Sequence, residues 1–420
     1  MTQLSVYSEI AQLDTVVIHS PGPEVDHMTP SLMHDLLFDD ILFGNEARQE
    51  HEVFRKILAK VANRVLDIQD LFVETLANEE ARKHFLSRFK MMHDLTDKKI
   101  GLLNDMAPEQ LAAKVTGGWF KEIDKGQRYR FITPPTPNLL FMRDPCSVIG
   151  DGVSINKMAT DARNTEPIIL ESVMHYHPVY GVDRESQIWF DASLRYLEGH
   201  PEAHHSIEGG DILVLSDEIV AIGISIRTKQ STVTMLAEQL RKRSQFKTLI
   251  AVLMPHERSA MHLDTIFTQV DEENCLIFPP YLDPSHSEVL PALKMDLSSK
   301  ELSIVLKPSL LQALKDEGFP LNPIFCGGHH RIDQEREQWT DGANSFCLAP
   351  GVILMYDRNT KTMNELESAG FKIREAESVL KYDINLLDGS KYAVMIRGNE
   401  LSRARGGPRC MTMPLKRMKK

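Results

Sequence analysis

The sequence has little of what marks secreted, membrane-spanning and nucleic-acid-binding proteins. Its five cysteines are scattered and form no CxxC pair, so neither a disulfide framework nor a structural zinc site is expected. No stretch approaches the roughly 18 consecutive apolar residues of a membrane span, and the N-terminus lacks the basic and apolar segments of a signal peptide. A net charge of −11 disfavours nucleic acid and anionic membranes as partners, because both need a basic face. These absences predict a cytoplasmic protein, and the negative charge favours a cationic substrate.

The composition that remains is ordinary for a globular protein. Hydrophobic residues make up 42% of the chain and charged residues 25%, so a sizeable buried core is available. With 420 residues the chain can form two or three domains, or one large catalytic domain with an insertion.

Four apolar stretches are each split by turn residues, and each predicts a β-hairpin. They cover residues 147–156, 212–225, 266–279 and 345–360. Helical spacing of apolar residues lies between them, at 232–246 and 308–317, and residues 16–21 contribute to a further copy of the unit. A hairpin-plus-helix unit that recurs along the chain predicts a radial, propeller-like α/β architecture.

Two regions interrupt this repeat. Residues 70–124 are wholly helical in pattern, and Gly117 and Gly118 can end the last of these helices. We therefore predict an inserted helical subdomain at 70–124, with the catalytic α/β domain formed by residues 1–69 and 125–420. Residues 374–392 are polar and precede the last strand, which predicts a surface loop or an extra helix.

Acidic side chains stand just ahead of three of the predicted hairpins. Asp144 lies in FMRDP, Glu208 and Asp211 lie in IEGGD, and His262 and Asp264 lie in MHLDT. In a radial fold the starts of equivalent strands converge at one end of the central axis. We therefore expect these carboxylates and the histidine to meet in one pocket.

Carboxylates that converge repel one another unless a cation lies among them. A guanidinium is such a cation, because it is planar, permanently charged and offers paired donors that match carboxylates. A divalent metal ion is the alternative, but calcium and magnesium sites usually draw several oxygen ligands from one loop, whereas these acids are far apart in the chain. Gly209 and Gly210 are expected to let the backbone pass close to the ligand, where a Cβ would block it.

Arginines recur at a matching interval. Arg163 follows Asp144 by 19 residues, and Arg227 follows Glu208 by the same interval. Arg405 stands beside a glycine pair in RARGGPRC. Such arginines either pair with the acids or bind the carboxylate of an amino-acid substrate. Acids at one end of a pocket and arginines at the other would suit a zwitterion with a cationic tail.

Cys410 completes the candidate site. A single cysteine is more often an inert buried residue. The other four fit hairpin or core positions: Cys146, Cys275, Cys326 and Cys347. Cys410 differs because it follows the glycine-rich turn 406–409 at the mouth of a strand. Arg409 beside it is expected to lower its pKa, as would a bound guanidinium. A thiolate with a histidine nearby is the minimal set for covalent attack.

Several motifs, in this order from residue 138 to the C-terminus, resemble those of the arginine deiminase family. They are FMRDP, IEGGD, MHLDT, REQWTDGAN, APGVILMYDRNT and RARGGPRCMTMPL, with SPGPEVDHMTP and LLFDDILF similar in the N-terminal part. The resemblance covers nearly the whole chain. It implies the pentein fold, in which five pseudo-symmetric ββαβ units surround an axis and a helical insertion follows the first unit.

The resemblance also implies an activity in arginine catabolism. L-arginine would be hydrolysed to L-citrulline and ammonia through a covalent S-alkylthiouronium intermediate. Cys410 would be the nucleophile and His262 the general acid and base. Glu208 would bind the guanidinium and assist proton transfer, while Asp144 and Asp264 would hold its nitrogens.

The resemblance assigns the remaining residues to the other end of the substrate. Arg163, Arg227 and Arg405 resemble the arginines that hold the substrate carboxylate, and Asn138 would lie beside them. Asp211 would be a less important member of the group of residues around the substrate. The reaction implied needs no metal and no organic cofactor. A homodimer or homotetramer fits the family.

Two kinds of alternative stay open. A related guanidine-modifying enzyme, such as an amidinotransferase, a dimethylarginine hydrolase or an agmatine deiminase, would use similar residues. Agmatine has no carboxylate, so the three arginines argue against it. A non-catalytic arginine-binding or adhesion protein on the same scaffold need not keep Cys410, His262 and Glu208 together.

Overall fold

Five sheets with one strand order form the body of the protein in the computed structural model, which describes residues 4–191 and 205–418. In each sheet a strand pairs antiparallel with its neighbour, and that neighbour pairs parallel with a third strand. The first of these sheets joins both ends of the chain. It contains β20 (Met413–Arg417), β1 (Leu13–Ile18) and β2 (Arg64–Asp67).

The four predicted hairpins supply the other four sheets and are confirmed. They are β5 (Cys146–Ile149) with β6 (Gly152–Ile155), β8 (Ile212–Val214) with β9 (Ile219–Ile224), β11 (Phe267–Gln269) with β12 (Asn274–Ile277), and β16 (Phe346–Ala349) with β17 (Val352–Tyr356). The parallel third strands are β7 (Ile188–Asp191), β10 (Thr248–Leu253), β15 (Asn322–Phe325) and β19 (Tyr392–Ile396). The β16–β17 turn needs a glycine, because Gly351 has a φ of +74°.

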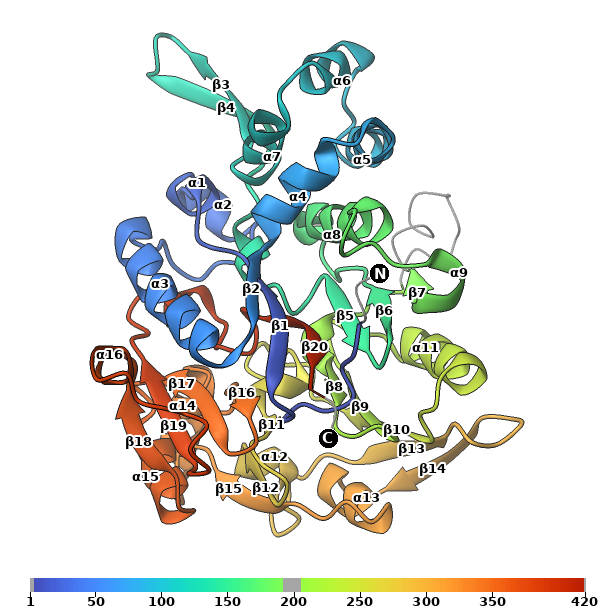
Figure 1. The fold of residues 1–420 in the computed structure, drawn as a ribbon, viewed down its shortest axis with the longest axis vertical. Coiled ribbons are helices and arrows are strands. Elements are labelled where there is room, and N and C mark those ends of the chain that lie inside the picture. The colour runs from blue at the N-terminus through green and yellow to red at the C-terminus, as the bar shows by residue number, and fades with distance from the viewer. Residues whose placement is uncertain (1–3, 192–204, 419–420) are drawn as a thin grey trace.

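A helix lies between the second and third strands of each unit. These helices are α3 (Gly44–Val61), α8 (Thr165–Tyr176), α11 (Gln230–Arg243), α13 (Leu310–Asp316) and α15 (Thr360–Ser368). In Figure 1, β1, β20, β5 and β8 lie near the centre, and α3, α8 and α11 lie outside them. Apolar spacing explains this placement in α11, where Val233, Leu236, Ala237 and Leu240 are buried on one face.

Smaller elements extend the units. A hairpin of β13 (Ala292–Asp296) and β14 (Ser303–Lys307) widens the third sheet, and β18 (Lys372–Glu375) adds an edge to the last one. The predicted polar stretch 374–392 contains the short helix α16 (Ala376–Lys381), which is one of its two expected forms. The remaining short helices are α1 (Pro23–Asp26), α2 (Pro30–Met33), α9 (Arg184–Gln187), α12 (Pro279–Leu282) and α14 (Arg331–Trp339).

The segment 70–124, which was predicted to be a helical insertion, is not helical throughout. Its helices are α4 (Ile68–Leu76), α5 (Glu79–Met92), α6 (Asp97–Asn104) and α7 (Pro108–Thr116). α7 ends before Gly117 and Gly118, as predicted. The expectation of helix up to residue 124 was wrong, because β3 (Trp119–Ile123) and β4 (Arg128–Thr133) form a hairpin after the glycines. Gly118 has a φ of +85°, which directs the chain out of the helix.

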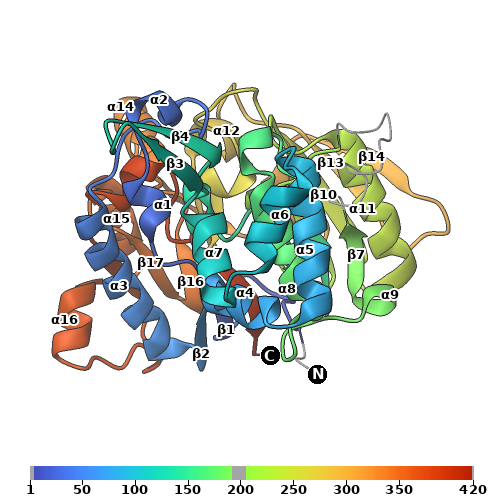
Figure 2. The same ribbon diagram turned by 90° about the horizontal axis from the view of Figure 1, so that it is seen from above.

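The insertion packs on the body of the protein through α8. Phe72, Phe85 and Phe89 belong to the same hydrophobic core as Ile169 and Val173 of α8. Figures 1 and 2 both place α5 beside α8, and the two helices are in contact. In the part of the chain that is described, no helix combines the length and apolar character needed to cross a membrane.

Candidate active site

The hairpin starts meet at one end of the central strands, as predicted. Asp144 precedes β5, and Glu208 and His262 each precede a short 3₁₀ turn that opens β8 and β11. A narrow cavity of about 30 Å³ lies beside them, and Glu208, Asp211 and Asp264 are not part of its lining. Seven of the predicted site residues line it: Asn138, Asp144, Arg163, Arg227, His262, Arg405 and Cys410. Because the cavity is so small, the side chains of the site fill most of the space between them.

His262 and Glu208 form a buried hydrogen-bonded pair. His262 Nε2 lies 2.8 Å from Glu208 Oε2, and His262 Nδ1 lies 3.8 Å from Asp144 Oδ1. Burial by itself would lower the pKa of His262, but the charge of Asp144 and the hydrogen bond to Glu208 raise it to about 9. Burial would raise the pKa of Glu208, but Arg227 and His262 lower it to about 2. At neutral pH the pair is an imidazolium and a carboxylate.

The two glycines of IEGGD make room for protein groups, which corrects the expectation that they admit a ligand. A Cβ on Gly210 would lie 2.5 Å from His262 Nδ1, and a Cβ on Gly209 would meet the carbonyl of Arg143. The N–H of Gly210 also donates to Asp144 Oδ1 (3.1 Å). Close packing of the histidine against this turn therefore depends on glycine.

Cys410 lies in the turn before β20, as predicted, and its backbone is fixed from two sides. Its N–H donates to Asn344 Oδ1 (3.2 Å), and its carbonyl accepts from the N–H of Arg143 (3.0 Å). Its Sγ lies 3.9 Å from Asp264 Oδ2. A Cβ on Gly407 would lie 2.6 Å from Asn344 Oδ1, so glycine lets this turn approach Asn344.

Arg409 does not lower the pKa of Cys410, so this expectation was wrong. The Arg409 guanidinium donates to Asp264 Oδ2 (2.7 Å) and to Glu9 Oε2 (3.2 Å), and it is buried. Burial raises the pKa of Cys410 well above its usual value, and the charges of Asp264 and Asp144 raise it further. In the free protein Cys410 is therefore a protonated thiol.

Asp264 connects Arg409 to Cys410. Its Oδ2 accepts from Arg409, whereas its buried Oδ1 has no hydrogen-bond partner within the described residues. Burial raises the pKa of Asp264. A buried acceptor without a donor costs about 1–3 kcal/mol, so a ligand with an N–H group directed at Oδ1 would relieve this cost.

Arg163 turns toward the acids in the free protein. Its Nη1 donates to Asp144 Oδ2 (2.7 Å) and lies 3.9 Å from Glu208 Oε2. Its Nε and Nη2 donate to Glu166, a buried residue that the sequence analysis did not select. Burial raises the pKa of Glu166 to about 7, although Arg163 opposes this shift. The local signal for Glu166 was its spacing of three residues from Arg163.

The other predicted substrate-binding residues surround the same cavity. Arg227 Nη1 lies 3.8 Å from Glu208 Oε1. Arg405 stacks on Trp339, with its Cζ 3.3 Å from the ring centroid, and it donates to the Trp339 carbonyl. Asn138 Nδ2 donates to the carbonyl of Leu36 (2.7 Å). Because Arg163 and Arg227 both approach Glu208, acids and arginines are interleaved in the free protein and do not occupy separate ends of the pocket.

Asp211 supports the site from behind the cavity. Its Oδ1 accepts from the N–H of Leu263 (2.9 Å), and its Oδ2 accepts from the Ser225 hydroxyl (2.7 Å). Burial raises the pKa of Asp211 to about 7. It therefore fixes the backbone that follows His262.

Three residues that the sequence analysis did not select also shape the site. Asn344 binds the Cys410 N–H, and Arg143 donates to the Arg409 carbonyl. Asp341 is buried with Oδ2 unpartnered among the described residues, and burial raises its pKa to about 7. All three lie inside motifs that carried the family resemblance, but no charge pattern in the sequence distinguishes them.

The acid cluster also has the spacing of a metal site. Asp144, Glu208 and His262 each offer a ligand atom within 4.8 Å of the others. However, Arg163 already places a fixed positive charge against Asp144 and Glu208. A His262 with a pKa of about 9 carries a proton where a metal needs a lone pair. These side chains therefore suit a guanidinium better than a metal ion.

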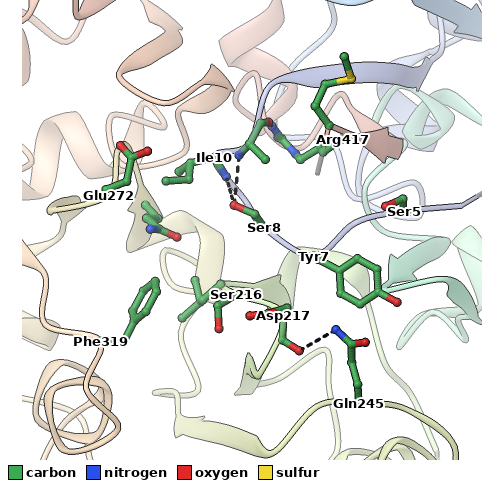
Figure 3. Close-up of a pocket in the computed structure, with 14 residues that line it drawn as sticks. Ser5, Tyr7, Ser8, Ile10, Ser216, Asp217, Gln245, Glu272, Phe319 and Arg417 are labelled. Carbon is green, nitrogen blue, oxygen red and sulfur yellow. Dashed lines mark hydrogen bonds between the residues drawn. The ribbon is translucent and has the colours of Figure 1, made fainter. Parts of the chain in front are cut away.

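A larger cavity, of about 500 Å³, lies at the opposite end of the strands. Its lining includes Ser216 and Asp217 in the β8–β9 turn and Glu272 in the β11–β12 turn, together with Ser8 and Arg417 (Figure 3). None of the ten predicted site residues lines it. The predicted chemistry therefore belongs to the small cavity beside Cys410.

Comparison with known proteins identifies the family. The arginine deiminase family model matches residues 34–417. An arginine deiminase of Borrelia recurrentis is 35% identical over 432 residues, which cover 98% of this chain and 97% of that protein. The chain belongs to the arginine deiminase family. An arginine deiminase of Bacillus cytotoxicus is likewise 35% identical, over 99% of this chain and 98% of its own length. All ten predicted site residues fall within the range matched by the arginine deiminase model.

Solved structures share the fold of this arginine deiminase family member at low sequence identity. The N-terminal domain of ArgZ, an arginine dihydrolase from cyanobacteria, has a TM-score of 0.50 at 12% identity, over 96% of this chain and 97% of that one. SxtG, an amidinotransferase from Microseira wollei, has a TM-score of 0.51 at 13% identity, and the match covers 99% of this chain and 98% of that one. AgrE bound to ornithine and NAD+ has a TM-score of 0.51 at 14% identity, and the match spans 97% of this chain but 40% of that longer chain. The chain therefore has the mixed α/β fold of the penteins.

Proposed function

We propose that this member of the arginine deiminase family hydrolyses free L-arginine to L-citrulline and ammonia, with Cys410 as the covalent nucleophile. The observation that carries the proposal is the position of the Cys410 Sγ, 3.9 Å from Asp264 in a cavity that Asp144 and His262 also line. Buried carboxylates around a thiol form a site for a guanidinium. The relatives named arginine deiminase support the choice of substrate.

Substrate binding exchanges one guanidinium for another. In the free protein Arg163 holds Asp144. The guanidinium of L-arginine takes this place between Asp144 and Asp264, and its N–H groups satisfy the unpartnered Asp264 Oδ1. Bidentate contacts of this kind orient the substrate Cζ toward the Cys410 Sγ.

The bound cation then activates the nucleophile. Burial and two neighbouring carboxylates hold the pKa of Cys410 well above its usual value in the free protein. A guanidinium beside the sulfur opposes those negative charges and lowers the pKa of the thiol. The thiol releases its proton to solvent as the substrate binds, so the reactive thiolate forms only in the complex.

The first half of the reaction releases ammonia. The thiolate adds to Cζ of the guanidinium and gives a tetrahedral adduct. His262, which starts as an imidazolium with a pKa of about 9, transfers its proton to the departing nitrogen. The C–N bond breaks, ammonia leaves, and an S-alkylthiouronium remains on Cys410. Glu208 holds the imidazole ring through the 2.8 Å hydrogen bond to Nε2.

The second half returns the enzyme to its starting state. The now neutral His262 removes a proton from water, and the hydroxide adds to the thiouronium carbon. The C–S bond breaks as the added hydroxyl becomes the citrulline carbonyl, and its proton passes to the leaving Cys410 sulfur. L-citrulline leaves, with Cys410 again a thiol and His262 again an imidazolium. The proposed steps need no metal or organic cofactor.

The carboxylate end of the substrate is held by the arginines. Arg163, once it leaves Asp144, joins Arg227 and Arg405 near Asn138. Support comes from the position of these four side chains in the lining of the same cavity as Cys410. Asp211 keeps the Leu263 backbone in place and so supports His262.

A substrate panel tests the function. The purified protein is incubated with L-arginine, agmatine and methylated arginines, and ammonia and citrulline are measured. We expect turnover of L-arginine and at most slow turnover of agmatine, because agmatine lacks the group that the arginines bind. Equal turnover of agmatine would contradict the carboxylate clamp, and transfer of the amidino group to an added amine without citrulline would identify an amidinotransferase. Binding without any product would identify a binding protein.

We further propose an architecture and a cellular setting. The shared strand order of the five sheets supports five pseudo-symmetric units closed around an axis, with 1–69 and 125–420 as the catalytic domain and 70–124 as a subdomain. All five cysteines are free, which supports a cytoplasmic location. A homodimer or homotetramer is supported by the exposed apolar side chains Ile304, Val305 and Leu306 on the edge strand β14. Light scattering of the purified protein tests the oligomeric state.

A further inference from the structure

A second cluster of titratable side chains lies outside the catalytic cavity, where the insertion meets the body of the protein. His84 is on α5, and Glu171 and His175 are one turn apart on α8. His84 Nε2 is 3.1 Å from Glu171 Oε1, and this oxygen is 4.0 Å from His175 Nδ1. One ligand atom from each of the three residues lies within 4.8 Å of the others.

Two of these side chains are buried without the partners that buried polar groups need. His175 has a side chain that is 2% exposed, and neither ring nitrogen has a hydrogen-bond partner within the described residues. Glu171 is fully buried, and its Oε2 also has no partner among them. A buried polar atom without a partner is destabilising, and a ligand that binds it removes this cost. Both side chains line a hollow of about 450 Å³ between α5, α8, α11 and β7, which has room for a ligand.

We propose that His84, Glu171 and His175 bind a divalent ion of the zinc class. A tetrahedral zinc with bonds of about 2.0–2.1 Å places its ligand atoms roughly 3.3 Å apart. The two histidine nitrogens lie 3.1 and 4.0 Å from Glu171 Oε1. Side-chain rotation would bring the neighbouring Oε2 to the same ion. Two imidazoles with one carboxylate suit zinc, whereas calcium and magnesium prefer oxygen ligands. The site does not depend on the proposed activity.

A further carboxylate lies behind His175. Its Oδ2, on Asp191, is 3.9 Å from His175 Nε2. A small movement of the ring would bring it within hydrogen-bond distance, the arrangement that orients a metal-binding histidine.

Two arginines near the cluster oppose a cation and must be accommodated. Arg88 Nη2 donates to Glu171 Oε1 (3.2 Å), and Arg184 lines the same hollow. Arg88 uses one carboxylate oxygen, so the unpartnered Oε2 stays available to the ion. The ion would join α5 of the insertion to α8 of the body, and its role would be to hold the insertion in place.

Zinc titration of the full-length protein tests the site. The protein is stripped with a chelator, and binding of Zn²⁺ is followed by calorimetry, with Co²⁺ as a spectroscopic probe of tetrahedral coordination. We expect one ion per chain and a rise in Tm of about 2–5 °C at saturating Zn²⁺. His84→Ala should weaken binding at least tenfold, and His175→Ala should abolish both binding and the rise in Tm. His84 is on a helix and partly exposed, so alanine there is compatible with folding.

Two control variants separate this site from other histidines. His34→Ala removes a fully exposed histidine, and His262→Ala removes the histidine of the catalytic cavity. Both should bind Zn²⁺ and Co²⁺ as the unmodified protein does. Loss of binding in His262→Ala would place the ion in the catalytic cavity and overturn the proposal. Unchanged binding in His84→Ala and His175→Ala, or no stoichiometric binding to the unmodified protein, would also overturn it.

Discussion

His262 Nε2 and Glu208 Oε2 lie 2.8 Å apart, and both side chains are shut off from solvent. Burial lowers the pKa of His262, but the charge of Asp144 and the hydrogen bond to Glu208 outweigh burial and raise this pKa to about 9. The imidazolium needed for ammonia release is therefore present at neutral pH and is lost as the pH rises through about 9.

The variant Glu208→Gln removes one of the negative charges that stabilise this imidazolium. We expect the alkaline limb of the kcat profile to move down by about 1 pH unit or more, with a lower kcat throughout. An alkaline limb that stays in place would remove Glu208 from this role.

Removal of the nucleophile separates binding from chemistry. In Cys410→Ser, kcat for arginine should fall by roughly 10⁴-fold or more. Arginine should still raise Tm, because the acids that hold its guanidinium remain. Cys347→Ser is a matched control, since the Cys347 Sγ lies 2.9 Å from the Ala349 carbonyl and a hydroxyl can make the same contact. If Cys410→Ser kept substantial turnover, the covalent mechanism would be wrong.

The close packing of Gly210 against His262 predicts that activity depends on the position of the His262 ring. In Gly210→Ala the new Cβ would lie 2.5 Å from His262 Nδ1, so the ring must move away from Glu208. We expect kcat to fall by about 100-fold, the lower range for loss of a general acid. Gly101→Ala is the control, because Gly101 is on α6 and a Cβ there meets nothing. This control should keep its activity and gain roughly 0.5–1 kcal/mol of stability, measured by urea unfolding. A fully active Gly210→Ala would show that the ring position does not matter.

The role of Arg405 is tested by comparing two substrates. Arg405→Ala should raise KM for arginine about 10–100-fold, the effect of one charge-assisted hydrogen bond of roughly 1.5–3 kcal/mol. Turnover of agmatine, however slow, should not change, because agmatine has no carboxylate. Arg331→Ala removes an arginine paired with Glu288 and Glu335 at the surface and should leave both values unchanged. An equal loss with both substrates would assign Arg405 a structural role through Trp339.

Asp341 should make stability depend on pH. Burial raises its pKa from 3.8 to about 7, so the folded protein binds this proton more tightly than the unfolded chain does. Its contribution to the free energy of unfolding therefore falls as the pH rises from about 4 to 7. Asp341→Asn cannot ionise, and asparagine tolerates the φ of +62° at this position. We compare the free energy of unfolding of the variant with that of the unmodified protein. This difference should favour the variant by on the order of a few kcal/mol more at pH 8 than at pH 5.

Unfolding in urea at the two pH values measures this difference. Glu166 and Asp211 also have pKa values of about 7 because burial raises them, so both proteins lose stability over the same range. The comparison between the two proteins isolates Asp341. If the free energies of unfolding of the two proteins differed by the same amount at pH 5 and pH 8, this carboxylate would not titrate as its burial requires.

Local pattern predicted the repeated units. Each hairpin has two apolar stretches around a turn, and the helical patterns at 232–246 and 308–317 have apolar residues at intervals of three and four, so short-range chemistry is sufficient to specify these elements. The β3–β4 hairpin was missed because Trp119–Ile123 is short and follows a long helical region. Its position is decided by the glycine turn at 117–118 and by pairing with Arg128–Thr133.

The order of motifs predicted which residues gather in the site. Asp144, Glu208 and His262 each precede a hairpin, and equivalent positions in equivalent units converge. Asn344 and Glu166 were missed because their importance comes from contacts: Asn344 binds the Cys410 backbone, and Glu166 binds Arg163. A sequence displays residue types and spacing, but it does not display which side chain faces which.

The sequence by itself determined the family, the class of substrate and the candidates for the nucleophile and its acidic neighbours, because these depend on residue type and on order along the chain. Only the tertiary structure decided the state of Cys410. Arg409 is its neighbour in the chain but faces Glu9 and Asp264, residues that are distant in sequence. Burial and the charges of Asp264 and Asp144 then raise the thiol pKa. A pKa depends on burial and on charges that act through space, and both are set only when the units close around the site.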